Sequence, residues 1–391
     1  GASRQSPVML VSLLVLALSV RGAPRATEAT GKDRRALVLT ERIDGHWGVD
    51  GRAAQLVDSL LRIGVQPTVV AVDVCPSYRY NSRFLQAGVP ALCVAEEDDR
   101  SIEFVLASAP FEHVLLHFRL VRGVPLPLFY EAELKKFAPQ AKVLVLTEQA
   151  HWLRFQTAEA ASEGGASANW AALEWAMSSE PLSQMVWGVR VREMLAYCQA
   201  GLVVAPTELE AALARRALPG LPTVVVPEAL PPLQRAAGWA AVDVPSTTRR
   251  GVVLLSDGRD AGDRANTRWF LRTVLPIIRE ASPELLVTIM GVRPLLGGNW
   301  TDGNDPYTIV IEDTTAESTR IALAGARAAV APAVSGTGDR PSAFAALSAG
   351  VPLAATMLGA IGLGVVREPH PSQASAGDSH ASLLLSERET G

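Results

Sequence analysis

Short apolar, β-branched runs alternate with longer amphipathic stretches along most of the chain. The run at 36–40 predicts a buried strand, the stretch at 52–63 puts its apolar residues on one helical stripe, and the run at 67–72 predicts another strand. Continuously apolar strands in strand–helix–strand units are typical of a parallel sheet that helices cover on both faces. The pattern therefore predicts an α/β protein built from doubly wound, Rossmann-like parallel sheets.

The same alternation runs through the rest of the first half. It predicts strands at 91–95, 113–117, 142–147, 201–205 and 223–226, and helices at 101–109, 128–137 and within a long insert at 151–200. The insert contains Trp152, Trp170, Trp175 and Trp187. Because an aromatic series in helices is more often core packing than a platform for sugars, we expect these side chains to be buried.

A stretch at 229–250, rich in Pro and Ala, lacks a clear period and is predicted to link two domains. Beyond it the alternation predicts strands at 251–255, 285–290, 308–311, 328–331 and 353–356, and helices at 266–280, 315–326 and 342–349. In the helix at 266–280 we expect Trp269, Phe270, Val274 and Ile277 to face inward.

These ranges predict a first domain at 31–228, a second domain at 251–366 and a polar tail at 367–391. Two tandem sheets of this kind would form a cleft at the carboxyl ends of their strands, where doubly wound sheets bind ligands.

The composition and net charge exclude some classes of binding partner and some kinds of site. The chain has 391 residues, which is room for two domains, and its net charge of -4 gives no electrostatic attraction for nucleic acid. Its three cysteines, Cys75, Cys93 and Cys198, show no Cys-x-x-Cys spacing, which excludes a dense disulfide framework and a four-cysteine zinc site. A single Cys75–Cys93 bridge stays open, although we expect three buried free thiols.

Residues 1–30 are predicted to be a targeting segment. Arg4 precedes an apolar run at 8–20, which is short for a bilayer span and has the length of a signal-peptide core. Such a signal would send the chain to the secretory pathway, in the endoplasmic reticulum or Golgi or as a secreted protein, and would allow membrane association. The alternatives are an organellar transit sequence and a cytoplasmic location.

The segment 331–352 is predicted to be a strand, a glycine-containing loop and a helix. Gly336 and Gly338 allow the backbone to turn sharply and to approach a ligand without a Cβ clash. Ser342 lies in the first turn of the helix, whose positive end and unpaired amides would favour a diphosphate. Arg340 adds a charge and bidentate donors at the same place.

Motifs around this loop resemble the family-4-type retaining glycosyltransferases of the GT-B fold (glycosyl transferases group 1). Ala349-Gly-Val-Pro-Leu-Ala-Ala-Thr356, followed by Gly359-Ala-Ile-Gly362, is similar to the family's Ala-Gly-Leu-Pro-Val-Val-Ala-Thr and its glycine-containing turn. The stretches 269–279 and 287–291 resemble the family's first helix and second strand of the donor domain, and 146–154 resembles a strand-end motif. The resemblance runs in order from Arg35 to Val366.

The resemblance implies a donor site in the second domain. Gly336, Gly338 and Arg340 would meet the donor diphosphate, and Arg259 would supply a second phosphate contact. Gly291 and Arg293 would lie close to the nucleotide.

On the acceptor side, the resemblance implies that His151 faces the donor sugar as the catalytic residue. It also implies that Gly48 and Gly51, in a predicted loop at 45–51, line the site of the acceptor.

The chain departs from the family at several of these positions. Ala345 stands where the family has a Glu that binds the ribose hydroxyls, and Ser342 replaces a second loop Lys. Gln149 replaces an Asp before the His, and Thr337 stands where other members have a further Glu. Losing a charged hydrogen bond of this kind costs about 1–3 kcal/mol, which would weaken donor binding.

The resemblance implies a glycosyltransferase that moves a sugar from a nucleotide-sugar donor, with retention, to an unidentified glycan, lipid or protein acceptor. No Asp-x-Asp follows a predicted strand, so we expect no metal and no cofactor. The alternative is a catalytically degenerate, glycosyltransferase-like binding protein, which the Ala at 345 and the polar tail favour. A nicotinamide-dependent oxidoreductase is disfavoured because no Gly-x-Gly-x-x-Gly follows the strand at 36–40.

Overall fold

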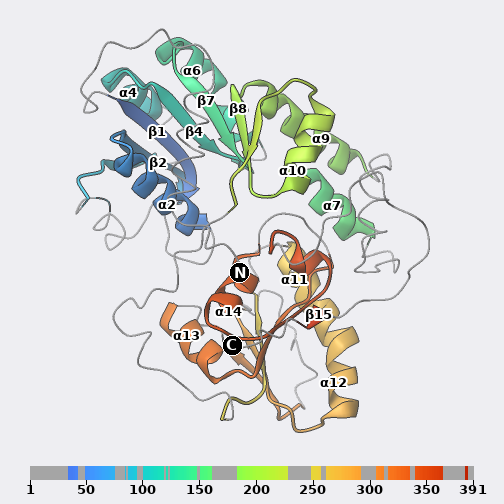
Figure 1. Cartoon of the computed structure of the whole chain (residues 1–391). Coiled ribbons are helices and arrows are strands. Elements are labelled where there is room, and N and C mark those ends of the chain that lie inside the picture. Colours follow the sequence, from blue (N-terminus) through green and yellow to red (C-terminus); the bar gives the residue numbers. More distant parts are fainter. Residues whose placement is uncertain are drawn as a thin grey trace. The chain divides into compact units, whose positions relative to one another are not determined.

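The computed structural model describes most of the chain between Arg34 and Leu385 (Figure 1). The described residues are 34–42, 49–74, 84, 87–94, 100–118, 120–121, 124–147, 150–160, 183–227, 248–256, 261–291, 305–311, 316–334, 340–363 and 384–385. Residue contacts divide the chain into two compact units, Gly1–Gln149 with Val189–Ala229, and Ala150–Gly188 with Leu230–Gly391.

The first unit contains a sheet of seven parallel strands in the order β3-β2-β1-β4-β7-β8-β9. The strands are β1 (Arg35–Arg42), β2 (Gln66–Val74), β3 (Ala91–Cys93), β4 (His113–His117), β7 (Lys142–Leu146), β8 (Leu202–Ala205) and β9 (Thr223–Val225). The helices of this half are α2 (Val49–Arg62), α4 (Arg100–Ser108), α5 (Leu126–Phe129), α6 (Glu131–Phe137), α9 (Gln184–Cys198) and α10 (Glu208–Ala217). Strand order that grows outward in both directions from β1 and β4 is the doubly wound topology.

Alternate residues of β1 explain why its sequence is apolar throughout. Ala36 and Val38 pack in one buried cluster with Leu60 of α2. Leu37 and Leu39 pack in a second cluster, on the other face, with residues of α4 and α6. Because successive side chains of a strand point to opposite faces, a sheet covered on both faces needs an unbroken apolar run.

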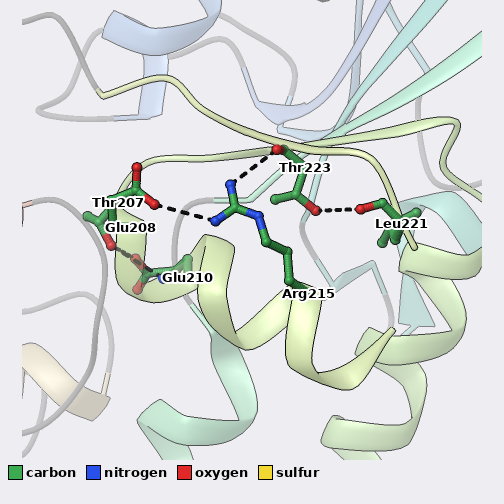
Figure 2. Close-up of polar contacts among 6 residues, drawn as sticks. All are labelled: Thr207, Glu208, Glu210, Arg215, Leu221 and Thr223. Atoms are coloured by element: carbon green, nitrogen blue, oxygen red, sulfur yellow. Dashed lines mark hydrogen bonds and ion pairs between the residues drawn. The ribbon is translucent and has the colours of Figure 1, made fainter. Parts of the chain in front are cut away.

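Polar contacts connect α10 to the last strand of this sheet (Figure 2). Thr207, the residue before α10, accepts a hydrogen bond from the Glu210 N–H at 3.4 Å and donates its hydroxyl to the Glu210 carboxylate, so its side chain caps the helix. Arg215, in the last turn, lies 3.5 Å from Glu208 and donates to the Thr223 carbonyl at 3.2 Å. The bond to Thr223 holds the last turn of α10 beside β9, whereas the other contacts lie within the helix and its N-cap.

A small antiparallel pair that the periodicity did not predict follows β4. It consists of β5 (Leu120–Val121) and β6 (Val124–Pro125). Strands of two residues are too short to produce a pattern of alternating side chains.

The second unit contains a sheet in the order β12-β11-β10-β13-β14-β15. Its parallel strands are β10 (Val252–Leu255), β11 (Val287–Met290), β12 (Thr308–Ile311), β13 (Ala328–Ala331) and β14 (Leu353–Ala355), and β15 (Leu384–Leu385) pairs with β14 in the antiparallel direction. Its helices include α7 (His151–Ala160), α11 (Ala261–Trp269), α12 (Leu275–Ala281), α13 (Ala316–Gly325), α14 (Pro341–Ser348) and the short 3-10 helix Leu358–Ala360.

The predicted helix at 266–280 contains an unpredicted π-helical stretch, Phe270–Val274, between α11 and α12. Pro276 has no N–H to donate, and the Leu275 N–H reaches back five residues to the Phe270 carbonyl. The wider turn shifts the phase of the helix, so Phe270 and Leu275 are buried whereas Ile277 is 62% exposed. The expectation that Ile277 faces inward is therefore wrong.

The long insert at 151–200 is divided between the two units. α7 contacts α11, and Ala150–Gly188 groups with the second unit, whereas the sequence-based boundaries placed all of 31–228 in the first domain. Trp152 is buried as expected, but Trp187 is 54% exposed, which corrects that part of the prediction. Trp170 and Trp175 lie outside the described residues.

Two of the cysteines differ from the expectation of three buried free thiols. Cys93, half-buried in β3, is disulfide-bonded, and Cys198, the last residue of α9, is a free and exposed thiol. Cys75 lies outside the described residues. Disulfides persist mainly in oxidising compartments.

A polar network at the amino edge of the second sheet connects α12 to β12. Arg279 donates to the Asp305 carboxylate at 2.8 Å, to the Leu285 carbonyl at 2.6 Å and to the Thr308 hydroxyl at 3.0 Å. Burial raises the pKa of Asp305, but hydrogen bonds from Thr308 and Arg279 outweigh it, so this pKa lies below its usual value. Only about a fifth of each of the Arg279 and Asp305 side chains is exposed, 20% and 21%.

Replacing Asp305 with alanine is expected to lower the free energy of unfolding of the second unit by about 1–3 kcal/mol, because Arg279 and Thr308 each lose a charged partner. Urea denaturation followed by circular dichroism measures the change. Asp305→Asn keeps an acceptor and should lose less. An unfolding free energy equal to that of the unaltered chain would contradict the contribution assigned to this network.

No helix among the described residues is long and apolar enough to span a membrane. The predicted targeting segment at 1–30 lies outside those residues.

Candidate functional site

The strand order of the second sheet identifies the position where a ligand is expected. From β10 the chain proceeds outward to β11 and β12, then returns to β13 on the other side of β10. β10 and β13 are therefore neighbours whose following loops lead in opposite directions, which is the topological switch point of a doubly wound sheet. Ligands of such sheets bind outside the carboxyl ends of the strands at this point.

Two consecutive residues of α11 contact the loops on either side of the switch point. Thr267, 1% exposed, places its hydroxyl 2.8 Å from the Ser256 hydroxyl, directly after β10. Asn266, 9% exposed, accepts a hydrogen bond from the Val334 N–H at 2.9 Å, just after β13. α11 thus holds the exits of β10 and β13 by buried polar side chains.

Thr356 holds the exit of β13 from the other side. It directly follows β14, and its hydroxyl donates to the Ala333 carbonyl at 2.6 Å. The same hydroxyl oxygen accepts from the Gly359 N–H at 3.1 Å. The chain leaving β13 therefore has polar side chains from two separate elements against it.

Helix α14 begins immediately after this segment. Among the described residues no side chain caps its first turn: Arg340 occupies the N-cap position without a side-chain cap bond, and Pro341 is the first helical residue. Ser342 is half-buried in the first turn. Unsatisfied amides at the start of a helix attract an anion, and Arg340 brings a guanidinium to the same end.

The structure places four of the predicted donor-site residues at this edge of the sheet. Gly291 directly follows β11 with φ 86°, and its N–H donates to the Ile311 carbonyl at 2.9 Å. Arg340 and Ser342 lie at the start of α14, and Ala345, one turn further on, is only 1% exposed. Five of the other predicted site residues lie outside the described residues: Gly48, Arg259, Arg293, Gly336 and Gly338.

Two acceptor-side residues differ from their predicted settings. Gly51 lies within α2, which starts at Val49, so it belongs to a helix rather than to the predicted loop at 45–51. His151 is the first residue of α7 and is 6% exposed. It groups with the second unit, whereas the sequence placed it in the first domain.

Sequence reasoning assigned no role to Ser256, Asn266, Thr267 or Thr356. A positional signal existed for Ser256, which directly follows a predicted strand of the second sheet, and for Thr356, which ends one. An Asn inside a helix gives no comparable signal, because its partner Val334 lies 68 residues away in the sequence.

The first unit has buried polar side chains at the carboxyl ends of its central strands. Thr40 of β1 and His117 of β4 are 0% exposed, and Thr147, directly after β7, is 1% exposed. The Thr147 hydroxyl lies 3.4 Å from the Val204 carbonyl. β1 and β4 flank the switch point of the first sheet, as β10 and β13 flank that of the second. Both sheets therefore have buried polar side chains at this position.

A second group of buried polar side chains lies on α9. The Tyr197 hydroxyl donates to the Glu193 carboxylate at 2.6 Å. Burial, with the nearby charges of Glu193 and Glu210, raises the pKa of Tyr197 well above its usual value, so this phenol stays protonated. Nowhere in the described part of the chain do three or more His, Cys, Asp or Glu side chains gather in an arrangement able to hold a metal ion.

No protein-family model matches the sequence, and no curated protein matches it. Among solved structures, the chain is similar to trehalose-6-phosphate from E. coli bound with UDP-2-fluoro glucose, at 11% identity and TM-score 0.49 over 84% of this chain and 85% of that one. It is similar to the catalytic domain of starch synthase IV from Arabidopsis thaliana bound to ADP and acarbose, at 12% identity and TM-score 0.48 over 87% and 86%. It is also similar to UDP-GlcNAc 2-epimerase from Methanocaldococcus jannaschii, at 13% identity and TM-score 0.47 over 83% of each chain.

The sheets themselves define the class of fold. The chain is an α/β protein with two doubly wound, Rossmann-like sheets whose strands are parallel except for β15, and this part of the predicted fold class is confirmed. Its second unit gathers buried polar side chains and an uncapped helix start at the carboxyl edge of the sheet.

Proposed function

We propose that this chain is a glycosyltransferase of the GT-B type that binds a nucleotide-sugar donor on its second unit. The observation that carries the proposal is the switch point between β10 and β13, where α14 begins with Arg340 and without a side-chain cap. The ordered resemblance to family-4-type glycosyltransferases supports it, since Arg340, one of the residues that the resemblance assigns to the diphosphate, is the N-cap residue of α14.

The site would act by electrostatic stabilisation of the leaving group. In glycosyl transfer the leaving group is the nucleoside diphosphate, and negative charge grows on it as the glycosidic bond breaks. Helix amides and an Arg that are already oriented toward that charge stabilise it without reorganisation. We assign this role to the start of α14 with Arg340 and Ser342, together with Arg259, Gly336 and Gly338, while Gly291 and Arg293 lie beside the nucleotide.

The proposal extends to the stereochemistry of the reaction, its independence of metal, its acceptor and its location in the cell. We propose transfer with retention and without a metal, with His151 facing the donor sugar and Gly48 and Gly51 beside a glycan, lipid or protein acceptor. The disulfide at Cys93 supports a place in the secretory pathway, as the apolar run at 8–20 does. In that setting the N-terminal segment would mediate any membrane association.

The test uses the purified chain and a panel of UDP-, GDP- and ADP-sugars. We expect at least one donor to raise the melting temperature and to be hydrolysed or transferred, with release of the nucleoside diphosphate. Arg340→Ala should weaken binding of that donor about tenfold, as expected for the loss of one charge-assisted hydrogen bond. If no sugar nucleotide binds, the proposal is overturned.

A degenerate binding protein is the second candidate, and Ala345 favours it. At this position the resembling family has a Glu for the ribose hydroxyls. Donor binding without turnover, under conditions that include candidate acceptors, would identify this function instead.

Replacing Ala345 with glutamate is expected to lower the melting temperature of the free protein and to enlarge the rise that UDP causes. The first effect follows because position 345 is 1% exposed, and a buried carboxylate without a partner is costly. The second follows because ribose hydroxyls would donate to the new carboxylate, at about 1–3 kcal/mol per charged hydrogen bond.

The matched control is Ala346→Glu, since the neighbouring Ala346 is 0% exposed on the same helix. It should destabilise the protein without strengthening UDP binding. Equal responses to UDP in the two variants would count against placing Ala345 at the ribose.

A further inference from the structure

The segment that leaves β13 is held at one peptide group from two sides. The carbonyl of Ala333 and the N–H of Val334 belong to the same planar peptide unit. The Thr356 hydroxyl donates to the carbonyl at 2.6 Å, and the Asn266 side-chain oxygen accepts from the N–H at 2.9 Å. Both polar atoms of this peptide group are therefore bound by side chains, not by a neighbouring strand.

The two side chains come from elements that are far apart in the sequence. Asn266 lies on α11, 68 residues before Val334, and Thr356 follows β14, 23 residues after Ala333. Both residues of the peptide group are buried, Ala333 at 4% and Val334 at 5% exposed. A buried peptide group that loses one of these partners is left with an unsatisfied atom, so the pair strongly favours one orientation of its plane.

Thr356 is itself fixed against the end of β13. Its N–H lies 3.3 Å from the Ala331 carbonyl, and its hydroxyl oxygen accepts from the Gly359 N–H at 3.1 Å. The hydroxyl proton is thereby directed to Ala333, because the oxygen already uses one acceptor position toward Gly359. Asn266 is held similarly, as its neighbour Thr267 binds the exit of β10 through Ser256.

We propose that Asn266 and Thr356 are positioning residues that clamp the Ala333–Val334 peptide group and so set the direction in which the chain leaves β13 toward the anion-binding start of α14. The inference deepens the proposed function and rests on it for its ligand, a nucleoside diphosphate. Neither side chain is assigned a contact with that ligand. Their effect on affinity comes from fixing in advance the orientation of the Ala333–Val334 peptide group, which would otherwise be set at the expense of binding energy.

The test compares four single variants and the Asn266→Ala, Thr356→Val double variant, with UDP as the probe. Asn266→Ala removes the acceptor, Thr356→Val removes the donor at nearly constant shape, and Thr356→Ser restores the hydroxyl. Asp305→Ala is the matched control, since it weakens the same unit at the opposite, amino edge of the sheet. Isothermal titration calorimetry measures the UDP dissociation constant, and hydrogen exchange measures protection of the Val334 amide.

We expect Asn266→Ala and Thr356→Val each to raise the UDP dissociation constant about tenfold, the equivalent of one buried hydrogen bond. Thr356→Ser should bind nearly as the unaltered chain does. The double variant should lose less than the product of the two single losses, because both act on one peptide group. The Val334 amide should exchange faster in the two clamp variants and not in Thr356→Ser.

Unchanged affinity and unchanged Val334 exchange in the clamp variants would overturn the inference. So would an equal loss of affinity in Asp305→Ala, since general destabilisation would then explain it. If the unaltered chain binds no UDP or other nucleoside diphosphate, the proposed function fails and the binding role with it. The exchange of the Val334 amide then decides the clamp separately, and unchanged exchange overturns that too.

Discussion

Replacing Gly359 with alanine is expected to destabilise the second unit by about 3–5 kcal/mol, enough to leave much of it unfolded. A Cβ atom at this position would lie 2.1 Å from the Ala331 carbonyl oxygen, far inside the contact distance of real Cβ atoms. The obstacle is backbone at the end of β13, which cannot move aside without breaking its pairing with β14. The Thr356 hydroxyl, 3.2 Å from the same Cβ, would also be displaced.

Urea denaturation with circular dichroism measures the loss of stability, and the yield of soluble protein reports on a variant too unstable to titrate. Two glycines of the same unit provide controls. Gly325, in open space at the end of α13, should tolerate alanine without loss. Gly350, also in open space but with φ +68°, should lose only about 1 kcal/mol from backbone strain. If Gly359→Ala loses no more than Gly350→Ala, the close approach to β13 is refuted.

Acidification is expected to destabilise the first unit through His113. This side chain begins β4 and is 0% exposed, and in the described structure neither ring nitrogen has a hydrogen-bond partner. The pKa of His113 is lowered from 6.5 to about 4, mainly by burial and in part by the charges of Lys142 and Arg34, while Glu112, 3.9 Å away, opposes them. The folded state therefore holds this histidine neutral at a pH where the unfolded chain protonates it.

The sign follows from proton uptake. Between pH 6.5 and about 4 the unfolded state binds the proton that the folded state refuses, so stability falls as the pH falls through this window. A difference of 2.5 pKa units, from 6.5 to about 4, is worth about 3 kcal/mol when the window has been crossed. Urea midpoints measured at intervals from pH 7 to pH 4 record the loss.

His113→Leu should flatten this pH dependence, since no group is then left at the position to protonate. Glu112→Gln should make His113 still harder to protonate, because it removes the nearby negative charge that raises the pKa. Equal pH dependence in His113→Leu and the unaltered chain would show that another group is responsible. Burial raises the pKa of Glu112, but the hydrogen bond from Arg34 and the nearby charges of His113, Arg34 and Lys142 bring it below its usual value, so this carboxylate adds its own loss of stability at the acid end of the range.

The strands were the most predictable part of this fold. The run at 36–40 falls within β1, and the runs at 113–117 and 308–311 coincide with β4 and β12. The runs in β1 and β4 carry their own signal, since a strand covered on both faces must be apolar along most of its length. β12 is an edge strand with Ile309 and Val310 exposed, and its β-branched residues made it predictable. The strand and helix on either side of the predicted glycine-containing loop, β13 and α14, were likewise found from the sequence.

The candidate site was predictable only where its residues follow strands. Arg340 and Ser342 could be found because they lie next to the loop that the motif identifies. Asn266 could not, since its role depends on meeting Val334 across the sheet. The sequence also concealed the outward orientation of Ile277, because Pro276 and the π-helical stretch before it change the helical phase.

Local periodicity in the sequence was enough to predict most of the strands and helices and their order, but not the short strands β5, β6 and β15 or the π-helical stretch Phe270–Val274. Only the tertiary structure decided that Ala150–Gly188 groups with the second unit and that Cys93 is disulfide-bonded. It also decided that one peptide group after β13 is held by Asn266 and Thr356. Those facts are contacts between residues distant in the chain, which form only when the packed sheets bring them together.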